Sequence, residues 1–400
     1  MILAADLYAT DLMHLEINTF FAAIFAEELD QDLHFFAERA HLQALGNSVP
    51  VAAAYPFISW QRISRFRLLR VPVREFLTIF RVIRISLYAR KHRPLFLHIF
   101  CASHLSHLLL RLVFKLLPPG CPILLTFHGE LEALAQKRPR PWSAAFWLPL
   151  SLRMPVSNLS PVVLGESIRS EAAQRNYTTS DWITIEHPYD FLSREVVRGG
   201  PDRPFLAGCI GGANRHKGTH HLFALAESFS EEVARGQMRF RIIGKTDTAL
   251  AADANEFVEI PPHHGFFTRE QYDRAISELD VVLFFFPEGA YQLTASGSLF
   301  DAIRHNKPII ALENSYFRHI QRLVTGDAIT LVNSFEEMRE RLREWSVTGP
   351  PQQISAAYGD VRRIHDRNHV AEEFLRQLST RIPIRRRVQH AADIVPGDAR

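Results

Sequence analysis

A short polar turn between two apolar runs is the first place in this sequence where residue types and spacing suggest chemistry. Val281–Phe286 has the length and composition of a buried strand, and Ile309–Leu312 reads as the next one. Between them, Ser296 begins an amphipathic helix that ends at Lys307-Pro308. The N–H groups at Ser296 and Gly297 favour an anionic ligand such as a diphosphate. An ordinary capped helix is the alternative interpretation.

The elements around this turn predict a parallel sheet. A strand, a loop, a helix and a second strand in this order form a βαβ unit, whose strands run parallel. The loop then lies at the carboxyl end of its strand, where open α/β sheets bind ligands. Thr268-Arg269-Glu270-Gln271 fits a capping box and predicts a helix that begins there and runs to Leu279.

Similar alternations of apolar and amphipathic segments fill most of the 400 residues. In the first half we predict strands at Met1–Leu7, Leu33–Ala37, Val49–Ala54, Leu95–Phe100, Pro122–Phe127, Met154–Ser157 and Trp182–Glu186. Its predicted helices are Thr19–Leu29, Gln61–Arg93, interrupted by Pro72, and His104–Leu117. In the second half we predict strands at Phe205–Ile210, Phe240–Ile243 and Phe257–Ile260, and helices at Thr219–Phe229, Phe335–Trp345 and Val361–Leu378.

A polar linker, Arg194–Pro204, separates the two alternations and predicts two α/β domains with a cleft between them. We place the domains at residues 1–192 and 193–365, followed by a helix at 366–382 and a disordered tail at 383–400.

Composition excludes several classes of protein. The net charge of +3 is too small to indicate nucleic-acid binding by the whole chain. Cys101, Cys121 and Cys209 are far apart and suit buried positions in a reducing compartment. No signal peptide, internal repeat or uncharged run of membrane-spanning length is evident. We therefore expect a cytoplasmic protein.

Several motifs together resemble the GT-B glycosyltransferases, and most closely their retaining family 4 group. In the second half these are Gly211–Gly218, Gly244-Lys245 and the segment SGSLFDAIRHNKPIIAL, which starts at Ser296. His128-Gly129 and His187-Pro188-Tyr189 fit the first half and hinge of that family. The resemblance covers Met1 to about Leu378 and implies an α/β, GT-B architecture of two Rossmann-like domains facing across a cleft.

The resemblance also assigns a binding site for a nucleoside-diphosphate sugar. Lys217 matches the family lysine that contacts the donor diphosphate. The family arginine falls at Gly212, and Arg215 is the candidate substitute. The full set of predicted donor-binding residues is Gly211, Gly212, Arg215, Lys217, Gly244, Lys245, Ser296 and Gly297. A solvated turn is the alternative interpretation for Arg215 and Lys217.

His128 and Asp301 are the candidate catalytic residues. His128 ends an apolar strand beside a glycine and is expected to position and polarise the reacting sugar; a satisfied interior histidine is the alternative. Asp301 stands at the second glutamate of the family's two-glutamate motif and is suited to a ribose hydroxyl. The first glutamate falls on Leu293, so its sugar contact is missing or supplied elsewhere; Glu288 is the nearest acid, out of register.

The loop after the first strand contains candidate contacts for the acceptor: His14, Glu16 and Asn18. An ordinary loop is the alternative interpretation. We expect no cofactor and no metal, because arginine, lysine and helix dipoles neutralise a diphosphate and no Asp-x-Asp motif is present.

The predicted function is transfer of a sugar from a nucleoside-diphosphate sugar to a glycan or lipid-linked acceptor, in cell-surface polysaccharide or glycolipid assembly. The missing glutamate at Leu293 leaves open a catalytically inactive GT-B scaffold. A nucleotide-sugar epimerase of the same architecture is the other alternative; it requires carboxylates poised for proton transfer, and no such set is evident.

Trp60–Gly120 is strongly basic, with twelve lysines and arginines and one acid, Glu75. The basic residues are Arg62, Arg65, Arg67, Arg70, Arg74, Arg81, Arg84, Arg90, Lys91, Arg93, Arg111 and Lys115. Apolar side chains interleave with them, a combination typical of helices on an anionic membrane surface. The alternative is that these helices pack on the sheet and their arginines are solvated or paired. The prediction is a cytoplasmic protein held peripherally on the inner face of the cell membrane.

Overall fold

The computed structural model describes residues 1–10, 13–58, 70–135, 144–191, 203–260, 267–287 and 290–384. The chain forms two compact units. Unit 1 comprises Met1–Phe127, Met154–Val162 and the chain from Ala371 onward. Unit 2 comprises His128–Arg153 and Val163–Val370. The units therefore interleave along the chain, whereas the domains predicted from the sequence are continuous segments.

The first sheet has seven strands in the order β3-β2-β1-β4-β5-β6-β7. Their bounds are β1 Ile2–Asp6, β2 Leu33–Glu38, β3 Ala53–Phe57, β4 Leu97–Cys101, β5 Ile123–Phe127, β6 Leu159–Leu164 and β7 Ile183–Ile185. From β3 to β5 the neighbouring strands pair in parallel. Every residue of β1, β4 and β5 is buried, which is why these strands read as continuous apolar runs in the sequence.

The second sheet has six strands in the order β10-β9-β8-β11-β12-β13, and all its neighbours pair in parallel. The bounds are β8 Phe205–Ile210, β9 Met238–Ile243, β10 Val258–Glu259, β11 Val281–Phe284, β12 Ile309–Leu312 and β13 Ile329–Val332. The strand order reverses between β8 and β11, so the carboxyl ends of these two strands form the switch point at which such sheets bind ligands.

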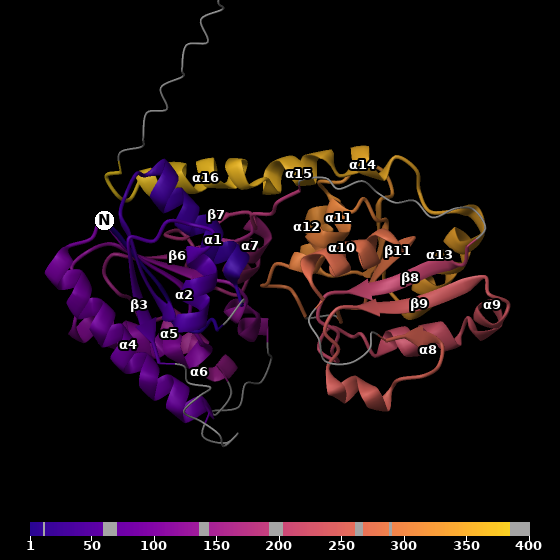
Figure 1. Cartoon of the computed structure of the whole chain (residues 1–400), viewed down its shortest axis with the longest axis horizontal. Coiled ribbons are helices and arrows are strands. Elements are labelled where there is room, and N and C mark those ends of the chain that lie inside the picture. Colours follow the sequence, from indigo (N-terminus) through magenta and orange to yellow (C-terminus); the bar gives the residue numbers. More distant parts are fainter. Residues whose placement is uncertain are drawn as a thin grey trace, which may run out of the picture. The chain divides into compact units, whose positions relative to one another are not determined.

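Each face of the second sheet has its own hydrophobic core. Val282 and Phe284 of β11 pack with the helices on one face, and Val281 and Leu283 pack with those on the other. Figure 1 shows α10, α11 and α12 on the first of these faces and α8 on the second. This alternation follows from the two-residue period of a strand.

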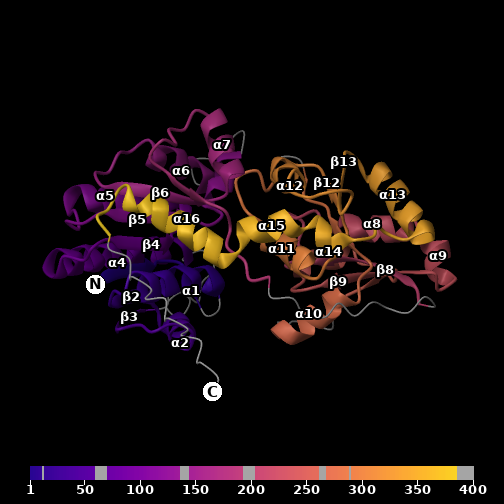
Figure 2. The ribbon, with the colours of Figure 1, turned by 90° about the horizontal axis from the view of Figure 1, so that it is seen from above.

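The described α-helices of unit 1 are α1 Leu15–Ala23, α2 Arg39–Gly46, α4 Arg70–His92, α5 His104–Leu116 and, crossing from unit 2, α16 Arg367–Ser379. Those of unit 2 are α6 Ala144–Leu152, α7 Glu166–Gln174, α8 His221–Glu227, α9 Ser230–Ala234, α10 Arg269–Ser277, α11 Gly297–Arg304, α12 Ser315–Gln321, α13 Phe335–Thr348, α14 Ile354–Ala357 and α15 Gly359–His365. A π-helix, Ile24–Glu28, continues α1, and 3-10 helices form at Glu130–Ala135 and Thr248–Ala252. Figures 1 and 2 show α16 beside α1, where the Phe374 and Phe21 ring centroids are 5.1 Å apart.

Most predicted elements form, and the capping box at Thr268 is confirmed. The predicted strand Met154–Ser157 is wrong: the strand is Leu159–Leu164, preceded by a turn in which Asn158 has a φ of 61°. The strand predicted at Val49–Ala54 lies later, at β3.

Two helix predictions are also corrected. The single helix predicted at Val361–Leu378 is two helices, because extended Asp366 separates α15 from α16 and accepts a hydrogen bond from the N–H of Asn368 at 2.9 Å. Pro72 does not interrupt α4 but lies in its first turn, where a missing N–H costs nothing. The rest of the basic stretch before Arg70 falls in residues 59–69, outside the described ranges. Across the described residues, no helix combines the length and the apolar character needed to cross a bilayer.

Candidate functional site

Three glycines bring the loops after β8, β9 and β11 into close contact. Gly211, Gly218 and Gly244 have φ angles of +85°, +70° and +135°, which side chains rarely adopt. A Cβ on Gly218 would lie 2.2 Å from the carbonyl oxygen of Phe285, and one on Gly244 would lie 2.1 Å from that of Gly211. The loops at the switch point therefore meet backbone to backbone, and the glycines permit this approach.

Lys217 extends into this junction. Its Nζ lies 5.7 Å from the ring centroids of both Phe286 and Tyr291. Burial lowers the pKa of Lys217, while Cys209 and Asp301 oppose the shift. Tyr291 has a left-handed φ of 57° and stacks on Phe286, so the loop after β11 is held in an uncommon conformation beside the lysine. A largely buried lysine of this kind is suited to an anionic ligand.

The first turn of α11 lies next to the same loop. A Cβ on Gly211 would lie 3.0 Å from the Cβ of Ser298 and 3.8 Å from the Nζ of Lys217. Ser296 is the N-cap residue but makes no side-chain capping bond; its hydroxyl instead pairs with that of Ser298 at 3.1 Å. A Cβ on Gly297 would meet no atom within 4 Å. Gly211, Lys217 and the start of α11 thus lie next to one another, and their predicted contact with a diphosphate stays a prediction.

The other predicted donor-binding residues lie further out. The guanidinium of Arg215 donates two hydrogen bonds to Asp253, at 2.6 and 2.5 Å, and its side chain is 51% exposed. Gly212 and Lys245 are exposed, and the carbonyl of Lys245 accepts the N–H of Ala213 at 2.8 Å. The guanidinium of Arg215 forms an ion pair with Asp253 in this conformation. It therefore does not lie beside Lys217 at the loop junction.

Asp301 belongs to a buried network within unit 2. Its carboxylate accepts hydrogen bonds from the hydroxyls of Tyr189 and, at 3.4 Å, Tyr272, and forms an ion pair with Arg269 at 3.0 Å. Burial, followed by the charge of Asp301, raises the pKa of Tyr189. The structure therefore surrounds this carboxylate with groups of the protein itself, and its predicted contact with ribose stays a prediction.

Glu132 is the acidic residue that the sequence interpretation missed. It lies on the 3-10 helix Glu130–Ala135 and accepts hydrogen bonds from the backbone N–H of Leu293 at 2.8 Å and of Gln292 at 3.3 Å. Burial raises the pKa of Glu132, and these hydrogen bonds oppose the shift. The first glutamate of the family motif falls on Leu293 in this chain. The carboxylate of Glu132 lies beside the backbone N–H of that residue. Its place just beyond the carboxyl end of β5 was the available signal in the sequence.

His128 lies at the same strand end and is half-buried. The carboxylate of Glu130 accepts the backbone N–H of His128 at 2.7 Å and that of Gly129 at 2.9 Å. The hydroxyl of Thr294 donates to the carbonyl of Gly129 at 3.3 Å. A Cβ on Gly129 would lie 3.6 Å from the Thr294 side chain, an ordinary contact, so this contact does not require a glycine. The predicted close approach of a ligand to Gly129 stays a prediction.

Comparison with known proteins rests on structure alone, since no family model and no curated sequence matches this chain. The apo form of the lipopolysaccharide outer core galactosyltransferase WaaB superposes with a TM-score of 0.63 at 14% identity, over 96% of this chain and 100% of that one. Anabaena HepE in complex with UDP-glucose superposes with a TM-score of 0.63 at 13% identity, over 95% and 99%. The chain has the GT-B fold. The predicted fold class and the resemblance to GT-B glycosyltransferases are thereby confirmed.

The GT-B fold is not confined to transferases among the similar structures. A putative UDP-N-acetylglucosamine 2-epimerase from Listeria monocytogenes superposes with a TM-score of 0.57 at 8% identity, over 95% of this chain and 96% of that one. Placement in the retaining family 4 group, and the retaining outcome with it, stays a prediction.

In this GT-B chain the three predicted acceptor residues lie on α1 or at its start, where the sequence predicted a loop. His14 is the N-cap residue of α1, and Glu16 is exposed in its first turn. Asn18 is fully buried, and its amide bonds to Asp6 at 2.8 Å and to His41 at 2.9 Å. Asn18 therefore holds the end of β1 against α1 and α2.

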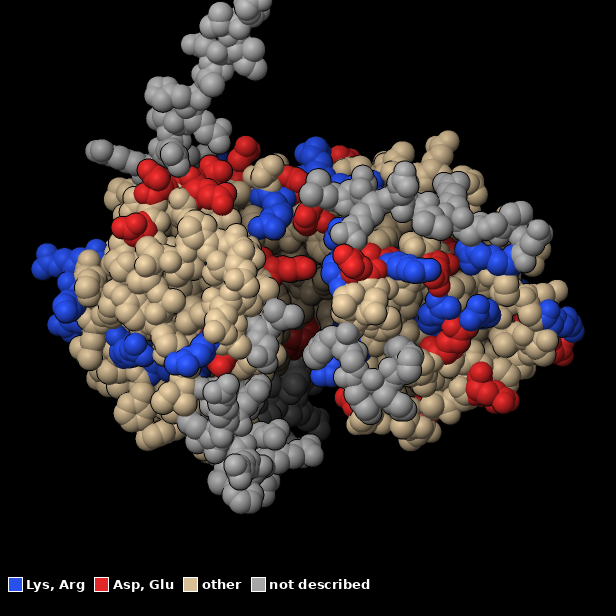
Figure 3. Space-filling model, in the orientation of Figure 1, with Lys and Arg blue, Asp and Glu red and all other residues tan. Residues whose placement is uncertain are grey.

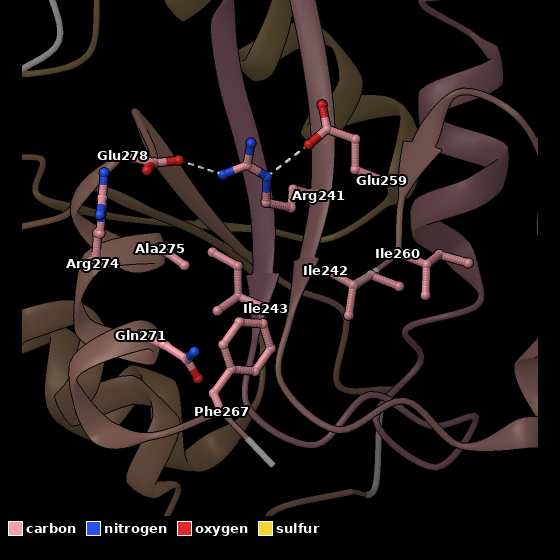
Figure 4. A pocket seen from close by; sticks show the side chains of 10 residues that line it. All are labelled: Arg241, Ile242, Ile243, Glu259, Ile260, Phe267, Gln271, Arg274, Ala275 and Glu278. Carbon is pink, nitrogen blue, oxygen red and sulfur yellow. Dashed lines mark hydrogen bonds and ion pairs between the residues drawn. The ribbon is translucent and has the colours of Figure 1, made fainter. Parts of the chain in front are cut away.

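A cavity of about 360 Å³ lies beside β9 and α10 of unit 2 (Figure 4). Its walls include Ile243, Phe267 and Gln271. Arg241 bridges Glu259 at 2.8 Å and Glu278 at 2.6 Å across it. Arg274 also lines the cavity; it is exposed and forms no ion pair with a residue that the structure describes, so the cavity adds one basic group to its apolar and amide surface. Within the described ranges, no cluster of three His, Cys, Asp or Glu side chains is suited to hold a metal ion.

Proposed function

We propose that the protein is a glycosyltransferase that moves a sugar from a nucleoside-diphosphate sugar to a glycan or lipid-linked acceptor. The observation that supports this most is the position of Lys217, beside the first turn of α11 at the switch point of the second sheet. The acceptor belongs, in this proposal, to the assembly of cell-surface polysaccharide or glycolipid. The structural similarity to WaaB and to HepE with bound UDP-glucose supports both parts.

The chemistry follows from charge. In this proposal, negative charge grows on the diphosphate as the sugar leaves, and the ammonium of Lys217 and the N–H groups at Ser296 and Gly297 stabilise that charge. Because Lys217 is largely buried, its interaction with phosphate is less screened than at an exposed position. These groups supply the neutralising charge in this proposal without a metal ion.

The retaining outcome is part of the proposal. The donor phosphate takes the proton of the acceptor hydroxyl, while His128 positions the sugar and polarises it. Glu132 supplies the carboxylate that the resemblance lacks at Leu293, where it holds the loop before α11 through two backbone N–H groups. No side-chain nucleophile is needed in such a reaction.

An epimerase is the second candidate function. The similarity to the putative epimerase favours it, and Glu132 has a raised pKa, as a proton-transfer group in such an enzyme requires. An epimerase inverts the configuration at one carbon of the sugar and leaves the nucleotide attached. A transferase releases the nucleoside diphosphate. A catalytically inactive scaffold binds the nucleotide and does neither.

One experiment separates the three. A thermal-shift screen of nucleoside-diphosphate sugars identifies the donor, since a ligand at about 100 times its Kd stabilises a protein by about 2.7 kcal/mol. The stabilising donor is then incubated with the protein and glycan or lipid-linked acceptors, and nucleotide release and sugar configuration are followed. Release of nucleoside diphosphate that depends on acceptor supports the proposal. If no nucleoside diphosphate or its sugar stabilises the protein, the proposal is wrong.

A further inference from the structure

The outer side of α4 in unit 1 carries a stripe of exposed apolar side chains. Phe76 and Phe80 are 60% and 55% exposed, and their ring centroids are 4.9 Å apart. Leu87 lies two turns further along the same side and is also exposed. Val82 and Ile85, on the opposite side of the helix, are completely buried. The helix therefore packs on the sheet through one face and presents a second apolar face outward.

Helix α5 widens this surface. Near its start, Ser103 and Ser106 each donate a hydrogen bond of 2.6 Å to the carboxylate of Glu75, near the start of α4. Beyond its end, the carbonyl of Leu117 accepts the hydroxyl of Ser86. The two helices therefore run side by side in the same direction.

This register places two exposed leucines of α5, Leu112 and Leu116, level with the part of α4 that contains Phe80 and Leu87. We call the five exposed apolar side chains of these adjacent helices the α4–α5 face: Phe76, Phe80, Leu87, Leu112 and Leu116. Apolar patches of this kind mark surfaces that contact a partner.

The basic residues of α4 and α5 fall into two groups, those that bind other groups of the protein and those that are exposed without an ion pair. Arg81 and Arg111 are buried and donate to backbone carbonyls, Arg81 to Leu7 at 2.8 Å and Arg111 to Met154 at 3.0 Å. Arg74 pairs with Glu75 at 2.6 Å. These three hold the fold together and are not available to a partner, so the alternative interpretation of the basic stretch applies to them.

Other basic side chains around the α4–α5 face are exposed, and none forms an ion pair with a residue that the structure describes: Arg90, Lys91, Arg93 and Lys115. Arg84 is exposed too, but it donates to the carbonyl of Pro56 at 3.4 Å and its guanidinium lies 5.4 Å from the ring centroid of Phe36. The only acid on α4 or α5 is Glu75, which is buried. In Figure 3, Lys and Arg gather at the outer edge of unit 1 over α4, while Asp and Glu gather near α16. The α4–α5 face is thus apolar with a rim of one charge sign.

We propose that the α4–α5 face docks on an anionic lipid surface. Phenylalanine and leucine enter the interface between headgroups and acyl chains, and the lysines and arginines at the rim bind the phosphates of the headgroups. The excess of positive charge favours this occupant over a second copy of the chain, because two such faces would repel each other. Docking is independent of the proposed function, although a membrane-bound transferase would have lipid-linked acceptors within reach.

The test is cosedimentation with vesicles of phosphatidylglycerol and phosphatidylcholine, compared with vesicles of phosphatidylcholine alone. The wild type is expected to bind the anionic vesicles at about 50 mM salt and to lose about tenfold in affinity at about 500 mM, since salt screens headgroup attraction. The charge variant is Arg90→Glu/Lys91→Glu/Lys115→Glu, and the apolar variant is Phe76→Ser/Phe80→Ser. Each is expected to bind about tenfold more weakly than the wild type.

Two controls change exposed side chains on other helices, one in charge and one in apolar surface. Arg235→Glu/Arg363→Glu/Arg376→Glu makes the same change in charge, at side chains that are 61%, 64% and 67% exposed. Val347→Ser removes an apolar side chain that is 81% exposed on α13. Both controls are expected to bind as the wild type does.

The proposal is overturned if the wild type does not bind anionic vesicles at low salt, or if the controls lose as much affinity as the face variants. It is also overturned if sedimentation velocity shows that the face joins two copies of the chain. UDP affinity, measured on the same variants by calorimetry, should not change. Vesicle binding without any nucleotide binding would refute the proposed function but would still support docking through the α4–α5 face.

Discussion

The carboxylate of Glu132 lies 2.8 Å from the backbone nitrogen of Leu293, a residue 161 positions away in the chain. This hydrogen bond and its neighbour at Gln292 tie the segment that follows β5 to the loop that leads into α11. The loop at the predicted anion site is therefore held by an acid from a different part of the sequence.

This contact predicts a pH dependence of stability. Burial raises the pKa of Glu132 above its ordinary value of 4.5, so the folded protein retains this proton more strongly than the unfolded chain. The resulting stabilisation is fully present below about pH 4.5 and is lost as the pH rises through the raised pKa. Glu132→Gln should not show this loss. The free energy of unfolding of the variant, relative to that of the wild type, should therefore rise as the pH increases above 4.5.

Urea unfolding of both proteins between about pH 4 and pH 7 measures the difference. Glu340→Gln, at an exposed position on α13, is the control and should follow the wild type. Parallel curves for Glu132→Gln and the wild type would contradict the assignment.

Lys217 should matter more for nucleotide binding than Arg215. A charge-assisted contact contributes about 1.5–3 kcal/mol, so Lys217→Ala is expected to weaken UDP or GDP binding by about tenfold or more. Arg215→Ala should cost less than about threefold, because the guanidinium is paired with Asp253 and is half exposed. Isothermal calorimetry gives both values. Unchanged affinity of Lys217→Ala would remove that residue from the site.

His128 should serve turnover more than folding. His128→Ala is expected to lower transfer by about a hundredfold, as for a lost positioning or polar contact. The melting temperature should change little, since the side chain is only half-buried. Glu130→Ala is the contrasting variant: it leaves the N–H groups of His128 and Gly129 without their acceptor and should lower the melting temperature by several degrees. A His128→Ala protein with full activity would refute the role.

The glycines at the loop junction should be intolerant of a side chain. Gly218→Ala and Gly244→Ala each combine a positive φ with a steric overlap against a backbone carbonyl, and are expected to cost about 2–5 kcal/mol. Gly236→Ala has a similar φ of +69° but open space around its Cβ, and should cost only about 1–2 kcal/mol. Equilibrium unfolding compares the three. If all three variants lose the same free energy of unfolding, the positive φ alone explains why glycine is needed, and the close approach of the backbone does not.

The sequence by itself determined most of the elements and the residues that meet at the predicted anion site. Apolar runs of strand length, helix caps and glycines are local signals, and strand order at a switch point follows from the chirality of βαβ units. These signals are enough to bring Gly211, Lys217 and Ser296 together. They failed at Met154–Ser157, where a short apolar run forms a turn and the strand begins only at Leu159.

Only the tertiary structure decided which charged side chains bind other groups of the protein and which remain exposed. Periodicity shows that a helix has two faces, but it does not show which neighbour covers each face, so buried Arg81 and exposed Arg90 look alike in the sequence. The partners of Asp301 and Glu132 come from segments far away in the chain. Such contacts depend on how sheets and loops pack, and no local pattern specifies them.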